Sequence, residues 1–587
     1  MHDLIFRGAT LYDGSGGPPR VADLAVSGGV ISAIDAPGVI VADGAREIDG
    51  AGCWLTPGFV DVHTHYDGQV SWDAELAPSA LNGVTTVVTG SCGVGFAPCA
   101  PHQRADLIAL MEGVEDIPGS ALAEGIQWAW QSFPEYLDAI AGTPRTIDVL
   151  CMVPHDALRV FVMGERALRA EAATQADLGA MRALLREALI AGAAGFSTGR
   201  TDNHRSASGA CTPAHEVQAE ELVALAKAFD GLGHGVLQAV SDFDLLRDPS
   251  AFDAEFDVLE AMFAAAPGHR ASLSWIQREP GAGQVRQIQA RVEAATERGL
   301  QLRLQTAPRG IGVLLGLEAT FHPFIGHPTY RAMHGLPLAE RVAKLRDPAV
   351  KAQILSEAPG RVSGDGTAIP PLADLMLARI EQIAFRLFVM AEQPDYEPPL
   401  SASLGARARA LGAPALSVIY DALLEDEGRA LLYFPIFNYA PGDLSDVAQM
   451  MQHPAALFGL GDAGAHVGTI CDYAFPTFAL DWWGLRRPTG RLPIERLVEL
   501  LSGRNAEHMG LNDRGRLAVG LRADLNLIDP AALRLSRPVL VADLPAGGRR
   551  LHQAASGLRL TVKSGEIIAQ DGVLTGARPG GLVRLGA

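Results

Sequence analysis

The chain has 587 residues, 48% of them hydrophobic, and a formal net charge of −19 at pH 7. The length and apolar content allow a large buried core. The acidic balance argues against nucleic acid or an anionic membrane as a partner. The sequence contains neither 18 consecutive apolar residues nor a basic N-terminus followed by a long apolar run. We therefore expect neither a membrane span nor a signal peptide.

Six cysteines are spread along the chain, and none forms a CxxC pair. They stand at positions 53, 92, 99, 151, 211 and 471. Because this density is low and the spacing irregular, a disulfide framework is not expected, and the sequence favours a reduced, cytoplasmic setting.

Both ends of the chain alternate short apolar runs with Gly and Asp turns, as in DLIFRGATLYDG near the start and LRLTVKSGEIIAQDG near the end. Such runs predict antiparallel strands. Neither end is long enough for a stable sheet by itself. We therefore predict that residues 1–56 and 512–587 pair into one small β-sandwich domain, with residues 57–511 inserted between them.

The central part predicts an α/β fold, a (β/α)₈ TIM barrel. Short apolar runs alternate there with amphipathic helical patterns, which is typical of parallel strands joined by helices. The eight runs cover residues 59–65, 85–90, 148–155, 195–199, 235–242, 271–277, 302–307 and 457–462. A ninth run, 431–438, leaves the count uncertain by one. Segments 97–145 and 310–430 exceed a minimal barrel, and insertions of this kind usually lie at the active-site face. The sequence leaves open whether 310–430 is a lid.

The motif PGFVDVHTH, at positions 57–65, is the strongest chemical signal. Alternate residues of a strand share a face, so Asp61, His63 and His65 point the same way, toward the barrel axis if Val60 and Val62 pack against helices. Two imidazoles at i and i+2 near the C-terminal end of a barrel strand form half of a zinc site. The alternative is a pair of polar strand residues facing solvent.

Three further residues follow barrel strands and face the same mouth. Asp462, in GLGDAGAH, can bind the metal and act as general base and then as acid, or it can simply cap a helix. Cys92, in TTVVTGSCG, offers a thiolate to zinc, or it is a buried structural cysteine. His155, in CMVPHDALR, can bind substrate or orient a ligand, and a structural histidine is the equal alternative.

The pentapeptide GFSTG at 195–199 matches the serine-hydrolase pattern G-x-S-x-G. That elbow needs a helix directly after the serine, whereas a polar loop follows here. A nucleophilic Ser197 is therefore not expected. We predict instead that Ser197, Arg200 and His204 line the substrate pocket.

Together these motifs resemble the amidohydrolase superfamily, specifically its D-aminoacylase (N-acyl-D-amino-acid deacylase) branch. The resemblance is carried by LTPGFVDVHTHYDG, NGVTTVVTGSCGVGFAP, VPHDALR, GAAGFSTGR, GLGDAGAH and GLNDRGRLAVGLRADLNLIDP. It implies that Cys92 is a metal ligand, in place of the carboxylated lysine of many relatives. The four lysines agree with this, since none follows a barrel strand: Lys227, Lys344, Lys351 and Lys563.

The chain departs from the branch at three places. The branch has a histidine at the end of the fifth strand and another at the sixth, where this sequence has Val240 and Trp275. The branch also has an arginine downstream of the catalytic Asp, where an ungapped count reaches Tyr473. We predict further substrate contacts from Gln238, Trp275, His466 and Tyr473.

The sequence thus predicts a metal-dependent hydrolase of a C–N amide bond in a small molecule, most simply an N-acyl-D-amino acid. The expected metal ligands are His63, His65, Cys92 and Asp462, and the expected catalytic residues are Asp462 and His155. One or two Zn²⁺ ions are expected, and another divalent metal would also fit. The alternative substrates are a cyclic amide, a carbamate or an N-formyl amine. A non-catalytic binding protein on a degenerate barrel is the alternative of another class. A homo-oligomer is compatible with the sequence.

Overall fold

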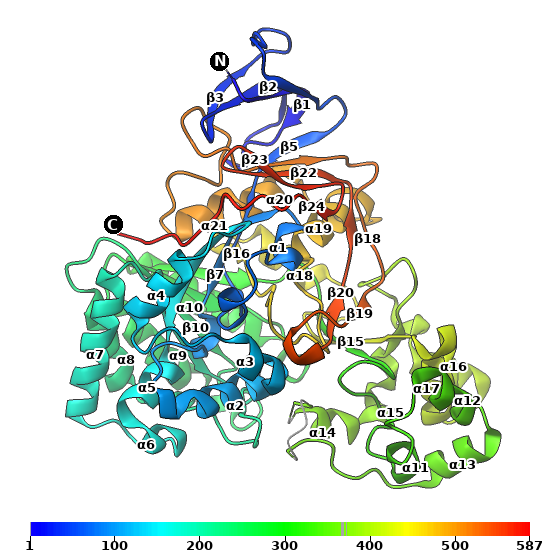
Figure 1. Cartoon of the computed structure of the whole chain (residues 1–587). Helices are drawn as coiled ribbons and strands as arrows, with labels where there is room; N and C mark the ends of the chain where they lie inside the picture. Colours follow the sequence, from blue (N-terminus) through cyan, green and yellow to red (C-terminus); the bar gives the residue numbers. More distant parts are fainter. Residues whose placement is uncertain (1, 365–368, 371, 587) are drawn as a thin grey trace.

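The computed structural model describes residues 2–364, 369–370 and 372–586 and contains a parallel eight-stranded barrel sheet at its centre (Figure 1). Its strands, in chain order, are β6 (Phe59–Asp61), β7 (Val84–Thr89), β8 (Asp148–Pro154), β9 (Gly195–Arg200), β10 (Val236–Ser241), β11 (Arg270–Ser274), β12 (Gln301–Thr306) and β16 (Ala456–Phe458). Every neighbouring pair is parallel. All eight predicted runs form these strands, so the predicted barrel is confirmed.

Most of the barrel strands are buried along their length because both of their faces are covered. Every residue of β7 (VTTVVT) and β8 (DVLCMVP) is buried. Helices cover the outside of the sheet: α5 (His155–Met163), α7 (Gln175–Ile190), α8 (Ala219–Ala226), α9 (Phe252–Ala264), α10 (Gln284–Glu297), α18 (Ser445–Gln452), α20 (Ile494–Leu501) and α21 (Gly503–His508). The barrel is nearly closed: the His65 N–H donates to the Ala463 carbonyl at 2.8 Å, and the Asn505 amide donates to carbonyls at the ends of β6 and β16.

Strands from both chain ends form one sheet of nine strands. Its order is β24-β23-β22-β17-β5-β1-β2-β3, and β4 pairs with β1. The N-terminal strands are β1 (Leu4–Leu11), β2 (Arg20–Ser27), β3 (Val30–Asp35), β4 (Arg46–Asp49) and β5 (Trp54–Pro57). The C-terminal strands are β17 (Leu525–Ile528), β22 (Leu558–Lys563), β23 (Glu566–Gln570) and β24 (Val573–Leu574). The two ends meet where β5 pairs antiparallel with β17.

Two insertions lie beside the barrel. The first carries α2 (Arg104–Glu115), α3 (Gly119–Gly125) and α4 (Phe133–Ala141), and the second lies apart from it in Figure 1. The second insertion has its own hydrophobic core, with Phe324, Tyr330 and Ile419 among its buried residues. The ninth apolar run is β15 (Leu432–Phe437), which pairs antiparallel with β13 (Ile311–Leu315) and β14 (Phe388–Val389) outside the barrel. The uncertainty in the strand count is thereby resolved at eight.

Between β17 and β22 the chain leaves the nine-stranded sheet and runs down beside the barrel as an arm, residues 530–556 (Figure 1). The arm carries β18 (Arg534–Leu535), β19 (Val539–Val541), β20 (Arg550–His552) and β21 (Ala555–Ser556). The Leu551 N–H donates to the Val467 carbonyl at 2.6 Å, so the arm is bonded to the loop that follows β16.

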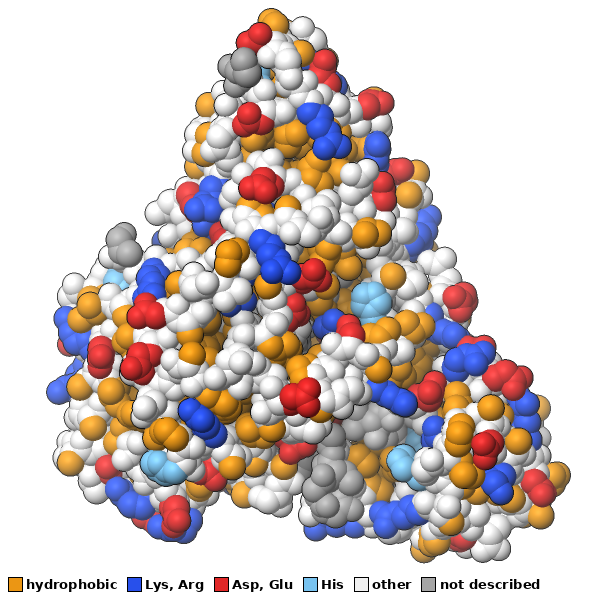
Figure 2. All heavy atoms as spheres, in the orientation of Figure 1, with side chains coloured by type: hydrophobic (Ala, Val, Ile, Leu, Met, Phe, Trp, Pro, Cys, Tyr) orange, Lys and Arg blue, Asp and Glu red, His pale blue; other side chains and the backbone are white. Residues whose placement is uncertain are grey.

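On the face of the described chain that Figure 2 shows, acidic and basic side chains are interspersed and no continuous basic area is seen. Among the described residues, no helix combines the length and the apolar character needed to cross a membrane.

Candidate metal centre

The loop that follows β6 carries the two histidines of the HTH motif into the barrel mouth. Val60 and Val62 pack in one cluster with Ala506 and Met509 on the helix side of the sheet. The alternation of the chain therefore turns His63 and His65 to the opposite side, and both are buried. The Asp61 carboxylate accepts the His63 N–H at 3.1 Å, which fixes the backbone at this point.

The ligand atoms of four predicted residues converge. One ligand atom from each of His63, His65 and Cys92 lies within 4.8 Å of the other two. His63 Nε2 is 3.2 Å from Cys92 Sγ and 3.4 Å from Asp462 Oδ1, and His65 Nε2 is 3.8 Å from the same oxygen. Tetrahedral zinc with bonds of about 2.0–2.3 Å separates its ligand atoms by roughly 3.3–3.8 Å. The spacing of these four side chains fits such an ion.

The electrostatics of the cluster also fit a cation. Asp462 Oδ1 has no hydrogen-bond partner among the described residues. Burial raises the pKa of Asp462 to about 7 and the pKa of the Cys92 thiol well above its usual range, and it lowers the pKa of His63 to about 4. A divalent cation would favour the ionised carboxyl and thiol and the neutral imidazoles, which are the ligand forms.

Two glutamines hold the ligands in place. Gln305 Oε1 lies 2.6 Å from His63 Nδ1, and its amide nitrogen donates to Ser272 Oγ at 3.0 Å. An imidazole that donates through Nδ1–H presents Nε2 as a lone pair, so this contact orients His63 toward the cluster. Gln238 Oε1 accepts the Cys92 N–H at 3.1 Å. Cys92 itself has φ 59°, a conformation that a non-glycine residue adopts only when its surroundings hold it there.

Ser197 supports the loop that carries Cys92. It is buried, it accepts the Gly93 N–H at 3.0 Å, and its hydroxyl donates to the Gly90 carbonyl. The Ser197 hydroxyl is therefore bonded to the backbone both before and after Cys92. The structure contradicts the pocket-lining role predicted for Ser197 and assigns it to the Cys92 loop instead.

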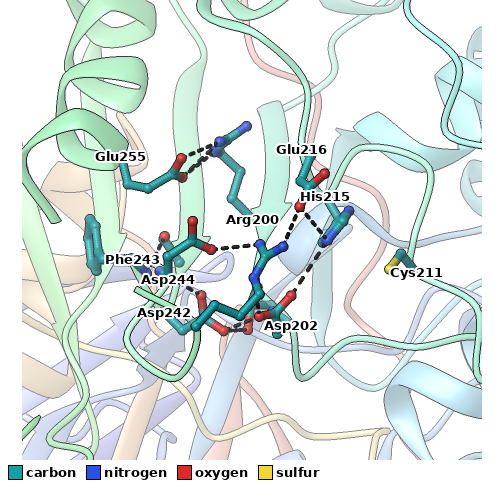
Figure 3. Close-up of polar contacts among 12 residues, drawn as sticks. Arg200, Asp202, Cys211, His215, Glu216, Asp242, Phe243, Asp244 and Glu255 are labelled. Carbon is teal, nitrogen blue, oxygen red and sulfur yellow. Dashed lines mark hydrogen bonds and ion pairs between the residues drawn. The ribbon is translucent and has the colours of Figure 1, made fainter. Parts of the chain in front are cut away.

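The structure also contradicts the predicted positions of His155 and Arg200. Both ring nitrogens of His155 are engaged, with Thr198 Oγ1 and with a Glu221 carboxylate oxygen, each at 2.9 Å. His155 is the first residue of α5, so its side chain packs between that helix and β9 rather than in the mouth. Arg200 pairs with Glu255 at 2.7 Å and also donates to a backbone carbonyl, as Figure 3 shows for the pair with Glu255.

Trp275 and Tyr473 do not reach the cluster either. The Trp275 indole N–H donates to the Val285 carbonyl in α10, and its ring packs edge-on against His453 outside the barrel. The Tyr473 hydroxyl accepts the Gln553 N–H from the arm. The structure therefore places neither residue where the predicted substrate contact would need it.

His204 and His466 do lie beside the ligand cluster. The pKa of each is lowered to about 4, first by burial and then by neighbouring charges that include His63. His466 Nε2 is 3.5 Å from a carboxylate oxygen of Glu115. Both histidines come from loops at the carboxyl ends of strands, His204 after β9 and His466 after β16. At the fifth strand, Val240 is a buried apolar residue, as the sequence indicated.

Three residues of the mouth were missed by the sequence analysis: Glu115, Arg278 and Gln305. Gln305 is a polar residue on the inward side of the run LRLQTA, and Arg278 lies in the loop that follows β11, so both positions could have been identified from the sequence. Glu115 ends a helix in the first insertion. Because the path of an inserted segment cannot be read from its periodicity, nothing in the sequence placed Glu115 here.

The comparisons with known proteins agree with this fold. The model of the amidohydrolase family matches residues 46–569, so the chain belongs to this family. It is 27% identical to the D-aminoacylase of Alcaligenes xylosoxydans xylosoxydans over 583 residues, 98% of this chain and 96% of that protein. A match of 44% identity over 201 residues covers 34% of this chain and 36% of the N-acyl-D-aspartate deacylase of the same organism.

A solved structure shows the shared fold. The N-acyl-D-glutamate deacylase from Bordetella bronchiseptica, complexed with zinc and a phosphonate inhibitor, matches with a TM-score of 0.62 over 99% of both chains at 22% identity. The family match and the D-aminoacylase relative confirm the predicted resemblance to the D-aminoacylase branch.

Proposed function

We propose that the chain is a zinc-dependent hydrolase that releases the acyl group from an N-acyl-D-amino acid or a related N-acyl compound. The observation that carries the proposal is the convergence of His63, His65, Cys92 and Asp462 on one point at the barrel mouth. Two imidazoles, a thiolate and a carboxylate form a donor set that suits zinc. The D-aminoacylase relative, matched along almost its whole length, supports the reaction class.

A zinc ion bound here would polarise the scissile carbonyl and lower the pKa of water toward neutrality. The chain's own residues then handle the proton. We propose that Asp462 accepts a proton from the attacking water and returns it to the leaving nitrogen. Gln305 keeps His63 Nε2 directed at the ligand cluster, and Gln238 fixes the backbone of Cys92. This proposal gives no catalytic role to His155.

Arg278 is proposed to bind the carboxylate of the substrate. It is buried, its Nε atom has no hydrogen-bond partner among the described residues, and one of its terminal nitrogens donates to the Ser241 carbonyl at 3.1 Å. No carboxylate of the described residues lies within ion-pair distance of it. Its charge contributes to the lowered pKa of His204, which supports a position near that histidine. A buried guanidinium without an ion-paired carboxylate is suited to a carboxylate ligand.

Replacing Arg278 with Met should lower kcat/KM for an N-acetyl-D-amino acid by about 10–100-fold, because a charge-assisted pair contributes roughly 1.5–3 kcal/mol. The same variant should act on the matching amino-acid amide at close to the native rate. Arg386→Met is the control, since Arg386 pairs with Glu279 next to Arg278. An equal loss on the acid and on the amide would contradict this role.

The proposed activity is tested by amine release. Protein stripped with a chelator and reloaded with zinc should release free amine from N-acetyl-D-amino acids and not from their L-enantiomers. Removal of the metal by the chelator should abolish amine release, because the proposed reaction needs a bound metal ion to activate water. If fully loaded protein releases amine from neither series, the proposed substrate class is wrong.

Three finer features belong to the same proposal. Zinc is proposed from the donor set, and a second ion is not required by the cluster. A cytoplasmic location is proposed because all six cysteines are free in the structure. Residues 1–56 with 512–587 are proposed as the bounds of the β-domain, and they agree with the pairing of β5 and β17.

A further inference from the structure

The first insertion delivers a buried carboxylate to the metal centre. Glu115 is the last residue of α2, and its side chain is only 2% exposed. Its two oxygens face two different imidazoles. Oε1 is 3.4 Å from His65 Nδ1, and Oε2 is 3.5 Å from His466 Nε2. Glu115 therefore lies between a proposed metal ligand and a histidine of the pocket.

Nothing else in the described chain compensates this carboxylate. No Lys or Arg nitrogen of the described residues pairs with Glu115, and its recorded ion-pair contacts are the two imidazoles. Glu115 Oε1 and His65 Nδ1, which face each other, have no hydrogen-bond partner among the described residues. A buried carboxylate is costly unless a partner stabilises its charge. The atoms that face the Glu115 carboxylate are His65 Nδ1 and His466 Nε2, so N–H groups of these imidazoles are the available partners.

Because Glu115 contacts Nδ1 of His65, the other ring nitrogen, Nε2, remains available to bind a metal. His65 Nε2 faces Asp462 Oδ1 within the ligand cluster, and Nδ1 is on the opposite side of the ring. When a carboxylate accepts the N–H of a metal-binding histidine, it fixes the tautomer and makes the other nitrogen more basic. Gln305 has the corresponding position behind His63, but as a neutral amide.

We infer that Glu115 is a positioning residue that accepts Nδ1–H of His65 on one oxygen and Nε2–H of His466 on the other. It directs His65 Nε2 at the metal and leaves His466 Nδ1 facing the pocket. This inference rests on the metal centre of the proposed function. It explains why a helix of the first insertion ends against the barrel mouth.

The backbone keeps Glu115 at this place. The His466 N–H donates to the Glu115 carbonyl, and Thr469 Oγ1 donates to Asp116 Oδ2 at 2.7 Å. The end of α2 is thus bonded to the loop that carries both Asp462 and His466. Asp116 offers a matched control, because it anchors the same loop without contacting an imidazole of the cluster.

The test is the zinc affinity of Glu115→Gln, measured by competition with a chromophoric chelator, with zinc content checked by elemental analysis. We expect affinity about 10–100-fold weaker than in the native protein. The melting temperature of the metal-free variant should remain close to native, because Gln fills the same volume. Asp116→Asn should bind zinc within about threefold of the native protein while losing the anchor to Thr469. Glu115→Asp should lie between the native protein and Glu115→Gln, and it serves if the Gln variant does not fold.

The outcomes separate this inference from the proposed activity. Native-like zinc affinity in Glu115→Gln would overturn the positioning role, as would an equal loss in Asp116→Asn, which would reduce Glu115 to a loop anchor. A native protein that binds zinc but releases no amine would overturn the proposed activity alone. A native protein that takes up no zinc would overturn both.

Discussion

Replacing Asp462 with Asn should lower kcat for N-acetyl-D-amino acids by roughly 10²–10⁴-fold. Asn has nearly the same shape, so the loop at this position should keep its structure. The amide cannot accept a proton from water or return it to a leaving nitrogen. The position of Asp462 Oδ1, 3.4 Å from His63 Nε2 and without a hydrogen-bond partner in the described chain, is where such a proton acceptor is needed.

The measurement compares kcat of the native protein and of Asp462→Asn at matched zinc content, since the variant also loses a ligand charge. Asp156→Asn is the control. Asp156 is buried, and burial likewise raises its pKa to about 7, but it accepts the Ala214 N–H away from the ligand cluster. We expect the control to lose less than about tenfold. A fully zinc-loaded Asp462→Asn with native kcat would exclude Asp462 as the proton-transfer group.

The sequence predicted the site wherever a residue directly follows a barrel strand. His63, His65, Cys92 and Asp462 lie far apart in the chain, yet each follows a strand of the same parallel sheet. The carboxyl ends of such strands meet at one face, so the topology alone brings these side chains together. The residues that hold them, Gln238 and Gln305 among them, lie on inward strand positions that the same alternation identifies.

The sequence failed where local structure turned a residue away. His155 also follows a strand, but α5 begins at this residue, and the helix turns its imidazole toward Glu221. Trp275 is out of phase: Ser272 faces inward to Gln305, so Leu273 and Trp275 face the helices. The alternation of side chains along a strand, applied strictly from Ser272, would have predicted the outward orientation of Trp275. Glu115 could not be predicted, because contacts of an insertion with the mouth depend on its tertiary path.

Replacing Lys563 with Met should lower the free energy of unfolding by about 3–5 kcal/mol. Lys563 is at the end of β22, and its side chain is fully buried. Its Nζ is 2.8 Å from Asp148 Oδ2 at the start of barrel strand β8 and 3.0 Å from Asp524 Oδ2. This lysine joins the nine-stranded sheet to the barrel. Met keeps the length of the side chain but leaves two buried carboxylates with one cation fewer.

The loss of unfolding free energy in Lys563→Met should become smaller as the pH falls. Burial by itself would raise the pKa of Asp148, but the charges of Lys563 and Arg514 outweigh it and hold this pKa below its ordinary 3.8. A carboxyl with a depressed pKa in the folded state stabilises the protein above its unfolded pKa, and this contribution is lost as the pH falls through the folded pKa. The difference between the native protein and Lys563→Met should therefore be full at pH 7 and should shrink below about pH 4.

Urea unfolding at pH 7 and at acidic pH measures both effects, with the midpoint and the slope compared between variants. Lys351→Met is the matched control, because Lys351 pairs with Asp421 at 2.6 Å on the surface, where the aspartate side chain is 58% exposed. Such a pair contributes about 0–1 kcal/mol because solvent screens it. If both lysine variants lose the same stability, the buried cluster does not join the two sheets in the way that its geometry indicates. If only Lys563→Met is destabilised, and less so in acid, the ion pair with Asp148 is a principal connection between the β-domain and the barrel.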